Sequence, residues 1–325
     1  MRAILVRTFG GPEVLNVEEL HDPTPGPTEV LVRVEAIGIN PVDTYIRTGT
    51  YAMKPDLPYT PGSDAAGVVE VAGDLVKSFT PGDRVYICGT RQGRGMGAYA
   101  SMVVSATSQV FPLAARLSFA QGAAIGVPYA TAYRALVSRA EARTGETVLV
   151  HGASGGVGLA TVQIARALGL TVLGTAGSRE GLTLLREQGA HHALDHRSLD
   201  YLHAVREITG GRGVDVIIEM LANVNLDHDL GLLAMHGRVV VVGNRGRVEI
   251  DPRQTMGKES AILGMILWAA SAEEMEATHA WLGDAFARGT LTPVVAGELP
   301  LSDAPRAHEL VISPGARGKI VLRTD

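Results

Sequence analysis

The chain has 325 residues, of which 46% are hydrophobic and 19% are charged, and its formal net charge at pH 7 is −5. This length predicts about two globular domains, and the lack of any long block of like charges disfavours binding to nucleic acid. No apolar run approaches the roughly 20 residues of a membrane-spanning helix, and Met1–Arg7 is too short and too charged for a signal peptide. We therefore expect a cytoplasmic protein without a membrane segment.

Cys88 is the only cysteine in the chain. A single cysteine excludes an intrachain disulfide and a multi-cysteine zinc cluster. A lone thiol is most often a small buried hydrophobic residue, and we expect that role for Cys88.

Residues 1–125 are rich in turn-forming sequences that separate short β-branched runs. The runs include Val30–Val34 and Gly67–Val71. The turns contain Gly10-Gly11-Pro12, Pro23–Pro27, Pro61-Gly62 and Pro81–Asp83. This alternation of strands and turns predicts a compact β-rich domain over residues 1–125.

From residue 126 onward, short apolar strands alternate with helical segments of about ten to fifteen residues. The expected strands are Val148–Val150, Val172–Leu173, Val214–Glu219 and Arg238–Gly243, with a closing strand near Ser260–Leu267. Continuous apolar strands between helices are typical of a parallel sheet that is covered on both faces. We therefore predict a doubly wound α/β domain over residues 126–267.

The remaining residues, 268–325, combine both patterns. We expect a helix over Glu273–Arg288, a strand near Thr292–Val295, a short helix from about Ser302, and a strand over Lys319–Leu322. We expect this segment to return to the β-rich first domain.

The stretch Val148–Gly158 joins an apolar strand to a glycine-rich turn and a helix. Glycines at 152, 155 and 158 allow a tight bend and a close approach of a pyrophosphate to the helix N-terminus. The first glycine of the G-x-G-x-x-G pattern is replaced by Ala153, so the flanking strand and helix carry the prediction of a dinucleotide site. The alternative is a glycine-rich contact between helix and strand that holds no ligand.

The residues that follow the next strand indicate which dinucleotide binds. Sites that prefer NAD place an acid there to bind the ribose hydroxyl, whereas Thr175–Arg179 contains no acid and ends in an arginine. This favours NADPH, although Glu180 follows at once. Arg179 is assigned on charge and position alone, and a solvated arginine at a helix start is the alternative.

Six segments carry a wider pattern: Gly10–Leu15, Gly38–Tyr45, Pro58–Asp64, Gly122–Gly126, His151–Gly158 and Glu219–Leu226. Together they resemble the zeta-crystallin and quinone oxidoreductase branch of the medium-chain dehydrogenase/reductase superfamily, and the resemblance covers essentially the whole chain. It implies a GroES-like catalytic domain, a Rossmann domain that binds NADPH, a small quinone or other electrophilic acceptor, and a homodimer or homotetramer. The Ala153 departure agrees with this branch.

The resemblance and the glycine-rich turn together assign the coenzyme-binding residues. They are Tyr45, Thr131, Ser154, Gly155, Gly156, Val157, Gly177, Arg179, His196, Asn225, Val242, Gly243, Asn244, Arg245, Met265, Ile266 and Leu267. The family places Gly177 and His196 at the adenosine end, Asn225 and Val242–Arg245 around the nicotinamide, and Met265–Leu267 on the closing strand. For Thr131 the alternative is a hydroxyl bonded to its own helical turn.

Zinc-dependent relatives in that superfamily carry a catalytic cysteine, a Gly-His-Glu segment and four structural cysteines. This chain has Asn40 in place of the first and Gly62-Ser63-Asp64 in place of the second. His21, His151 and His196 are too scattered in the sequence to suggest a substitute cluster, so we expect no metal site. A site without a metal favours a quinone, which accepts electrons readily and mainly needs hydrogen bonds to its oxygens.

Asn40, Tyr45 and Tyr51 are the candidate hydrogen-bond donors to the acceptor, and we assign them as the catalytic residues. Asn40 before Pro41 is also a favourable helix N-cap, and both tyrosines could be ordinary packing residues.

Four further questions stay open at this point. A tyrosine that matches Tyr51 donates a proton in related enoyl and alkenal reductases, so double-bond reduction is one alternative activity. An RNA-binding role is another, which the acidic net charge disfavours. Electrons pass either singly, to a semiquinone, or as a hydride. The glycine-rich loop Arg91–Gly97 either shapes the pocket or is a surface loop.

Overall fold

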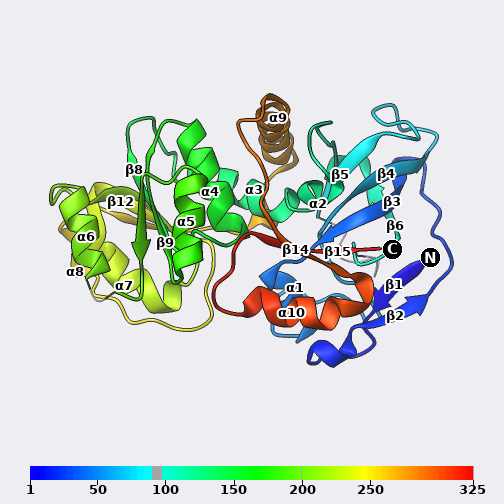
Figure 1. Ribbon diagram of the computed structural model, residues 1–325, viewed down its shortest axis with the longest axis horizontal. Coiled ribbons are helices and arrows are strands. Elements are labelled where there is room, and N and C mark those ends of the chain that lie inside the picture. The colour runs from blue at the N-terminus through cyan, green and yellow to red at the C-terminus, as the bar shows by residue number, and fades with distance from the viewer. Residues whose placement is uncertain (90–96, 199, 325) are drawn as a thin grey trace. The chain divides into compact units, whose positions relative to one another are not determined.

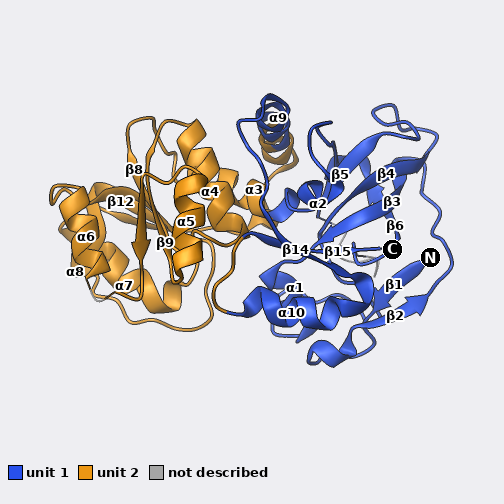
Figure 2. Ribbon diagram, viewed as in Figure 1, with its two compact units in different colours: residues 1–127, 279–313, 318–325 blue, residues 128–278, 314–317 orange. Residues whose placement is uncertain are grey.

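The computed structural model describes residues 1–89, 97–198 and 200–324, and it divides the chain into two compact units (Figures 1 and 2). Unit 1 contains residues 1–127, 279–313 and 318–325, and unit 2 contains residues 128–278 and 314–317. Except for Gly97, the loop Arg91–Gly97 lies outside the described residues. Within the described part of the chain, no helix is long and apolar enough to cross a membrane.

Unit 1 is built on a seven-stranded, mostly antiparallel sheet. Its strands run in the order β14-β15-β3-β4-β5-β7, and β6 pairs with β3. The bounds are β3 (Glu29–Gly38), β4 (Asp64–Ala72), β5 (Arg84–Cys88), β6 (Met102–Ala106), β7 (Val110–Pro112), β14 (Val295–Pro300) and β15 (Lys319–Arg323), with a separate hairpin of β1 (Arg2–Leu5) and β2 (Asn16–Glu19). The β-rich first domain predicted from the turns is thus confirmed.

Short helices complete unit 1. They are η1 (Pro12–Val14), α1 (Pro41–Arg47), η2 (Thr107–Gln109), α2 (Phe119–Gly122), η5 (Leu301–Asp303) and α10 (Ala304–Ile312). The core beneath them is apolar, and fully buried side chains such as Ile37, Ile87 and Tyr99 belong to it. Cys88 is buried in this unit, as expected of a lone thiol.

Strand β15 comes from the end of the chain and pairs with β3 from its beginning. Val321 lies opposite Gly38, and the Ile39 amide donates to the Ile320 carbonyl at 3.0 Å. This pairing brings Lys319 beside the residues that follow β3. The strand expected near Thr292–Val295 starts later in the structure, where β14 begins at Val295. Pro293 has no backbone N–H to donate to a neighbouring strand, so the strand begins after it.

Unit 2 is built on a six-stranded sheet in which every pair is parallel. The order is β10-β9-β8-β11-β12-β13, which reverses direction after β10. The bounds are β8 (Thr147–Val150), β9 (Thr171–Ala176), β10 (His192–Asp195), β11 (Val214–Glu219), β12 (Leu233–Val241) and β13 (Ala261–Gly264). This topology confirms the predicted doubly wound α/β fold.

Helices connect these strands and cover the sheet. They are α4 (Gly156–Ala167), α5 (Arg179–Glu187), α6 (Tyr201–Ile208), α7 (Ala222–Leu232), α8 (Arg253–Met256) and η4 (Leu267–Ala269). Two boundaries between the units fall within further helices, α3 (Gly126–Tyr133), which continues into the π-helical η3 (Arg134–Arg139), and α9 (Ala272–Arg288), which belongs to unit 1 from His279 onward. Right-handed crossovers place α4 and α5 on one face, and α6 and α7 on the other, because the strand order reverses between them. Helix α4 ends before Gly169, whose φ of +78° gives the left-handed conformation that commonly stops a helix.

Candidate functional site

The predicted coenzyme-binding residues of unit 2 gather at one edge of its sheet. The six strands are parallel, so the chain leaves all of them at the same edge, where doubly wound sheets bind their ligands. The residues there are Ser154–Val157 after β8, Gly177 after β9, His196 after β10, Asn225 after β11, Val242–Arg245 after β12, and Met265–Leu267 after β13.

The glycine-rich turn leaves the N-terminus of α4 open. Gly155 is the N-cap residue, and no side chain among the described residues caps the first turn of the helix. A Cβ added at Gly155 would come no closer than 3.5 Å to another atom, whereas one added at Gly158 would lie 2.5 Å from the Ala153 backbone. Gly158 therefore serves the packing of helix against turn, and Gly155 leaves space and free N–H groups for a phosphate.

Basic groups follow β9 and β10 at the neighbouring end of this edge. A Cβ added at Gly177 would lie 2.6 Å from His196 Nε2 and 2.9 Å from Arg197 Nε. Arg179 is exposed at the first position of α5, next to Ser178, whose hydroxyl caps the helix by accepting from the Gly181 amide at 3.1 Å. Sequence reasoning missed Arg197, because only the β9–β10 pairing brings it to Gly177.

The other half of the edge carries the residues assigned to the nicotinamide. Asn225 donates from its amide to both oxygens of Glu219, at 3.1 and 3.2 Å, so its own carbonyl oxygen is left to accept a hydrogen bond. A Cβ added at Gly243 would lie 2.3 Å from the Met220 carbonyl, so only glycine permits this approach of the chain after β12 to the end of β11. The Met265 amide donates to the Val241 carbonyl at 3.1 Å.

Two of the remaining assignments have particular surroundings. Thr131 lies on α3, is 5% exposed, and makes no hydrogen bond through its hydroxyl with another described residue, which leaves the bond to its own helical turn unsupported. The Ile266 carbonyl accepts from Arg134 at 3.2 Å, and the Arg245 amide donates to the Asn223 side chain at 2.9 Å.

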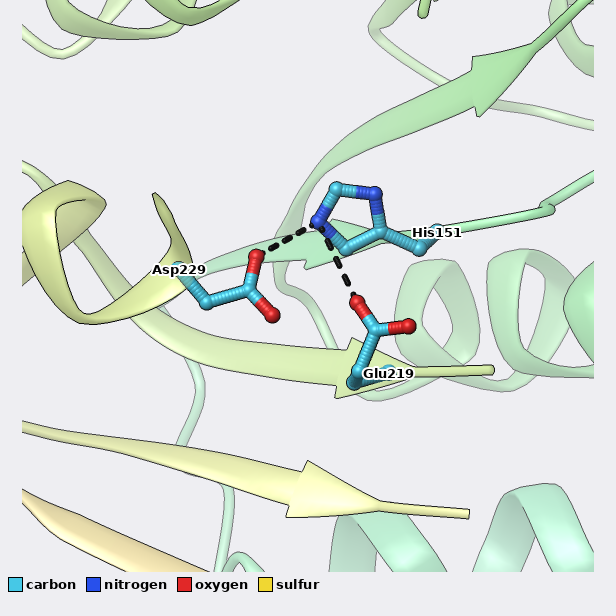
Figure 3. Close-up of side chains that lie close together, drawn as sticks. All are labelled: His151, Glu219 and Asp229. Atoms are coloured by element: carbon cyan, nitrogen blue, oxygen red, sulfur yellow. Dashed lines mark hydrogen bonds and ion pairs between the residues drawn. The ribbon is translucent and has the colours of Figure 1, made fainter. Parts of the chain in front are cut away.

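A buried acidic cluster lies behind the same edge and was not predicted. His151, the first residue after β8, lies 2.8 Å from Asp229 on α7 and 3.6 Å from Glu219 at the end of β11 (Figure 3). All three side chains are almost fully buried, with exposures of 3%, 0% and 0%. In the sequence, His151 was compared only with other histidines as a possible metal ligand. Its acidic partners are distant in sequence, and the β8–β11 pairing and helix α7 bring them to it.

The geometry of this cluster fits hydrogen bonding rather than a tetrahedral zinc ion. The 2.8 Å between His151 and Asp229 is a hydrogen-bond distance, shorter than the roughly 3.3 Å between two ligands of a tetrahedral zinc ion. Burial lowers the pKa of His151, but the Asp229 and Glu219 carboxylates outweigh it and raise that pKa above its usual value. Burial also raises the pKa of Glu219 to about 7. The second oxygen of Asp229 has no partner among the described residues, so a protonated Glu219 can donate to it.

A second buried cluster occupies unit 1, around Asn40. Lys319 Nζ donates to Asn40 Oδ1 at 2.5 Å and to Asp64 Oδ2 at 2.9 Å. Asn40 Nδ2 donates to the same Asp64 oxygen at 2.8 Å, and the other Asp64 oxygen accepts from the Val127 amide at 2.8 Å. The exposures of Asn40, Asp64 and Lys319 are 3%, 0% and 4%.

Asn40 is also the N-cap residue of α1, as its position before Pro41 predicts. Pro41 is the first helical residue, and the Asp43 carboxylate accepts from the Asn40 backbone amide at 2.8 Å. The Asn40 side chain itself bonds to Asp64 and Lys319. Burial raises the pKa of Asp43 to about 7.

Tyr45 and Tyr51 lie close to this start of α1. Tyr45 is on the helix, and its carbonyl accepts from the Tyr51 amide at 3.1 Å, so the chain turns back on itself between them. Both tyrosines are partly exposed, unlike the buried Tyr59 and Tyr99 of the same unit. Burial raises the pKa of Tyr51, which keeps its hydroxyl protonated at neutral pH.

The side chains at the positions of the zinc ligands do not fit a zinc ion. Asn40 and Ser63 offer an amide and a hydroxyl instead of a thiolate and an imidazole, and Zn²⁺ in dehydrogenase-like sites uses the latter pair. The Lys319 ammonium already lies within 3 Å of an oxygen of Asn40 and of an oxygen of Asp64, and it would repel a second cation.

Comparisons with known proteins agree with this architecture. The profile "Alcohol dehydrogenase GroES-like domain" matches residues 26–115, and "Zinc-binding dehydrogenase" matches residues 156–283. Rat and human proteins named quinone oxidoreductase are 52% and 51% identical over 324 residues, covering 99% of this chain and 97% of each relative. An Escherichia coli quinone oxidoreductase solved with NADPH has a TM-score of 0.89 at 32% identity, covering 99% of this chain and 100% of that one.

Identity of about one half over nearly the full length of both chains, together with the two matching domain profiles, shows common descent and not only a shared fold. The chain belongs to the quinone oxidoreductase branch of the medium-chain dehydrogenase/reductase superfamily.

Proposed function

We propose that this protein is an NADPH-dependent quinone oxidoreductase. The observation that carries the coenzyme half of the proposal is the uncapped N-terminus of α4 beside Gly155, where a phosphate has both space and donors. The acceptor half is supported by the relatives, which are named quinone oxidoreductases and match this chain over nearly its full length.

The unit 2 edge offers partners for the pyrophosphate, the 2′-phosphate and the nicotinamide carboxamide of NADPH. The amides of Gly156 and Val157 would hold the pyrophosphate, and the cations Arg179 and Arg197 would hold the 2′-phosphate, a role for which guanidinium groups are well suited. Asn225 would accept a hydrogen bond from the nicotinamide carboxamide through its free carbonyl oxygen. Bound NADPH supplies the electrons, and these residues hold and orient it.

In unit 1, Asn40, Tyr45 and Tyr51 would donate hydrogen bonds to the oxygens of the quinone. Negative charge develops on those oxygens during reduction, and preoriented donors stabilise it without rearrangement. The side chains at the zinc positions do not fit a metal, so we assign this stabilisation to neutral donors.

We also propose that the protein acts as a homo-oligomer in the cytoplasm. Strand β13 ends the unit 2 sheet, and its outer edge has no strand partner among the described residues. Ile262 on this strand is 38% exposed, so a second copy can extend the sheet and cover an apolar side chain. A single buried thiol fits a reducing compartment.

The test measures NADPH consumption with a small ortho- or para-quinone, with NADH and a simple ketone as comparisons. We expect turnover with NADPH and the quinone that a chelator does not change. Gly155→Val should weaken NADPH binding by about 10-fold or more, because its side chain would enter the phosphate space. Gly283→Val, at an open position on α9, is the matched control and should bind NADPH normally.

A wild-type protein that does not consume NADPH with any quinone would refute the activity. Normal NADPH binding by Gly155→Val would instead show that the pyrophosphate lies elsewhere. Loss of activity on chelation would contradict the assignment of the acceptor site to neutral donors.

A further inference from the structure

The amide of Asn40 can adopt only one orientation in this structure. A lysine ammonium has donors and no acceptor, so it must face the amide oxygen, and an ionised carboxylate accepts only, so Asp64 must face the amide nitrogen. The observed bonds follow this rule, with Lys319 on Oδ1 and Asp64 on Nδ2. Turning the amide over would place NH₂ against ammonium and oxygen against carboxylate.

This arrangement leaves Asn40 with one N–H to offer to a ligand. Its Oδ1 accepts from Lys319, and one of the two hydrogens on Nδ2 goes to Asp64. The second hydrogen on Nδ2 bonds to no described residue. Asn40 can therefore donate this hydrogen to an acceptor oxygen.

The surrounding backbone is shaped to hold the lysine and the aspartate in place. A Cβ at Gly38 would lie 2.8 Å from Lys319 Cε and 2.0 Å from the Ala123 carbonyl, and one at Gly126 would lie 2.3 Å from Asp64 Oδ1. Asp64 receives a further bond from the Val127 amide. Gly38 and Gly126 thus leave room for Lys319 and Asp64, and the Val127 amide fixes the carboxylate that binds Lys319.

We propose that Lys319 is a positioning residue of the acceptor site, which together with Asp64 holds the Asn40 amide so that its free N–H points to the quinone oxygen. This inference rests on the proposed quinone reduction. The hydrogen bond from this N–H strengthens as negative charge develops on the quinone oxygen. Because the amide cannot turn over, it does not need to reorient during the reaction. Lys319 itself does not need to touch the quinone.

A cycle of four enzymes tests this role: the wild type, Asn40→Ala, the paired change Asp64→Asn with Lys319→Met, and all three changes together. The paired change removes both charges, so no unpaired ion is left buried, which is the main threat to folding when Lys319 alone is removed. Urea unfolding verifies that each variant is folded. Quinone turnover and NADPH affinity are then measured separately.

We expect the paired change to lower kcat for the quinone by about 10- to 100-fold, which is at or below the roughly 100- to 1,000-fold cost of removing one positioned donor, because the amide remains but is no longer held. NADPH affinity should change by less than about twofold, because Lys319 belongs to unit 1 and the residues proposed to hold the coenzyme phosphates belong to unit 2. In the Asn40→Ala background the same paired change should lower kcat no further, because there is no amide left to position.

An equal loss of kcat in both backgrounds would overturn the inference, since Lys319 would then act independently of Asn40. An unchanged kcat in the folded paired variant would overturn it as well. Absence of quinone turnover in the wild type would refute the proposed function itself, so the two failures are distinguishable. Lys258→Met, which removes a half-buried lysine bound to two carbonyls in unit 2, is the control and should leave kcat unchanged.

Discussion

The two buried polar clusters balance their charges in different ways. In unit 1, Asp64 and Lys319 pair one carboxylate with one ammonium, and Asn40 is held between them. In unit 2, two carboxylates face a single imidazole, so the balance depends on how many protons the cluster holds. The first cluster orients a side chain without any shared proton, whereas the second adjusts to pH.

The difference matches where the clusters lie. The unit 1 cluster contains a residue proposed to touch the acceptor, where a fixed donor is needed. The unit 2 cluster lies behind the coenzyme edge and acts on it through Glu219, which accepts both Asn225 N–H bonds. We therefore expect changes in the first cluster to alter turnover, and changes in the second to alter stability and coenzyme binding with pH.

The largest effect should come from breaking the unit 1 ion pair from one side. Lys319→Met leaves Asp64 buried without its cation, and we expect the free energy of unfolding in urea to fall by about 3–5 kcal/mol. Adding Asp64→Asn should restore most of the loss. Lys77→Met, at an exposed position, should stay within about 0.5 kcal/mol of the wild type. A small loss for Lys319→Met would mean that water reaches Asp64.

The second prediction concerns the pH dependence of the unit 2 cluster. The folded pKa of Glu219 is raised from 4.5 to about 7, so the folded state holds a proton that the unfolded state releases between these values. The stability that Glu219 contributes is therefore fully present below pH 4.5 and is lost as pH rises to about 7. Glu219→Gln, which keeps the neutral form, should flatten this part of the profile of unfolding free energy against pH.

Two histidines of unit 1 give the opposite slope and serve as the comparison. Burial lowers the pKa of His279 and of His308 to about 3, so the stability they contribute is lost as pH falls from 6.5 towards 3. Glu219→Gln should leave this acid side of the profile in place. If the dependence of unfolding free energy on pH between 4.5 and about 7 is unaltered in Glu219→Gln, the cluster holds no shared proton.

A smaller effect is expected at the coenzyme edge. Arg197→Ala should raise the KM for NADPH by about 10-fold, because a charge-assisted bond to a phosphate is lost, and should leave the KM for NADH nearly unchanged. Arg179→Ala tests the other candidate in the same way. Arg186→Ala, elsewhere on α5, is a matched control. Equal effects on both coenzymes would rule out a role in binding the 2′-phosphate.

The smallest effect should come from Tyr51→Phe. Loss of one hydroxyl from a partly exposed donor should lower kcat/KM for a quinone by less than about 10-fold, with NADPH affinity unaltered. An enal should be measured beside the quinone. A selective loss of enal turnover would mean that Tyr51 serves as a proton donor in double-bond reduction.

Local patterns were sufficient for much of the fold. The apolar run Val148–Val150, the turn at Gly155 and the left-handed stop at Gly169 lie within a short stretch, so the strand, the open helix start and the helix end follow from neighbouring residues. The strand expected near Thr292 was the main displacement. There the propensity of two valines conflicted with a proline, and β14 starts only after it.

The sequence alone determined the family, the two fold classes and the choice of Asn40 as the residue in place of a catalytic cysteine. Only the tertiary structure decided which groups surround Asn40 and His151. Lys319 reaches Asn40 through the β3–β15 pairing, and Glu219 and Asp229 reach His151 through parallel pairing and helix packing. Charge balance in a buried cluster is a property of contacts between distant segments, which no local pattern specifies.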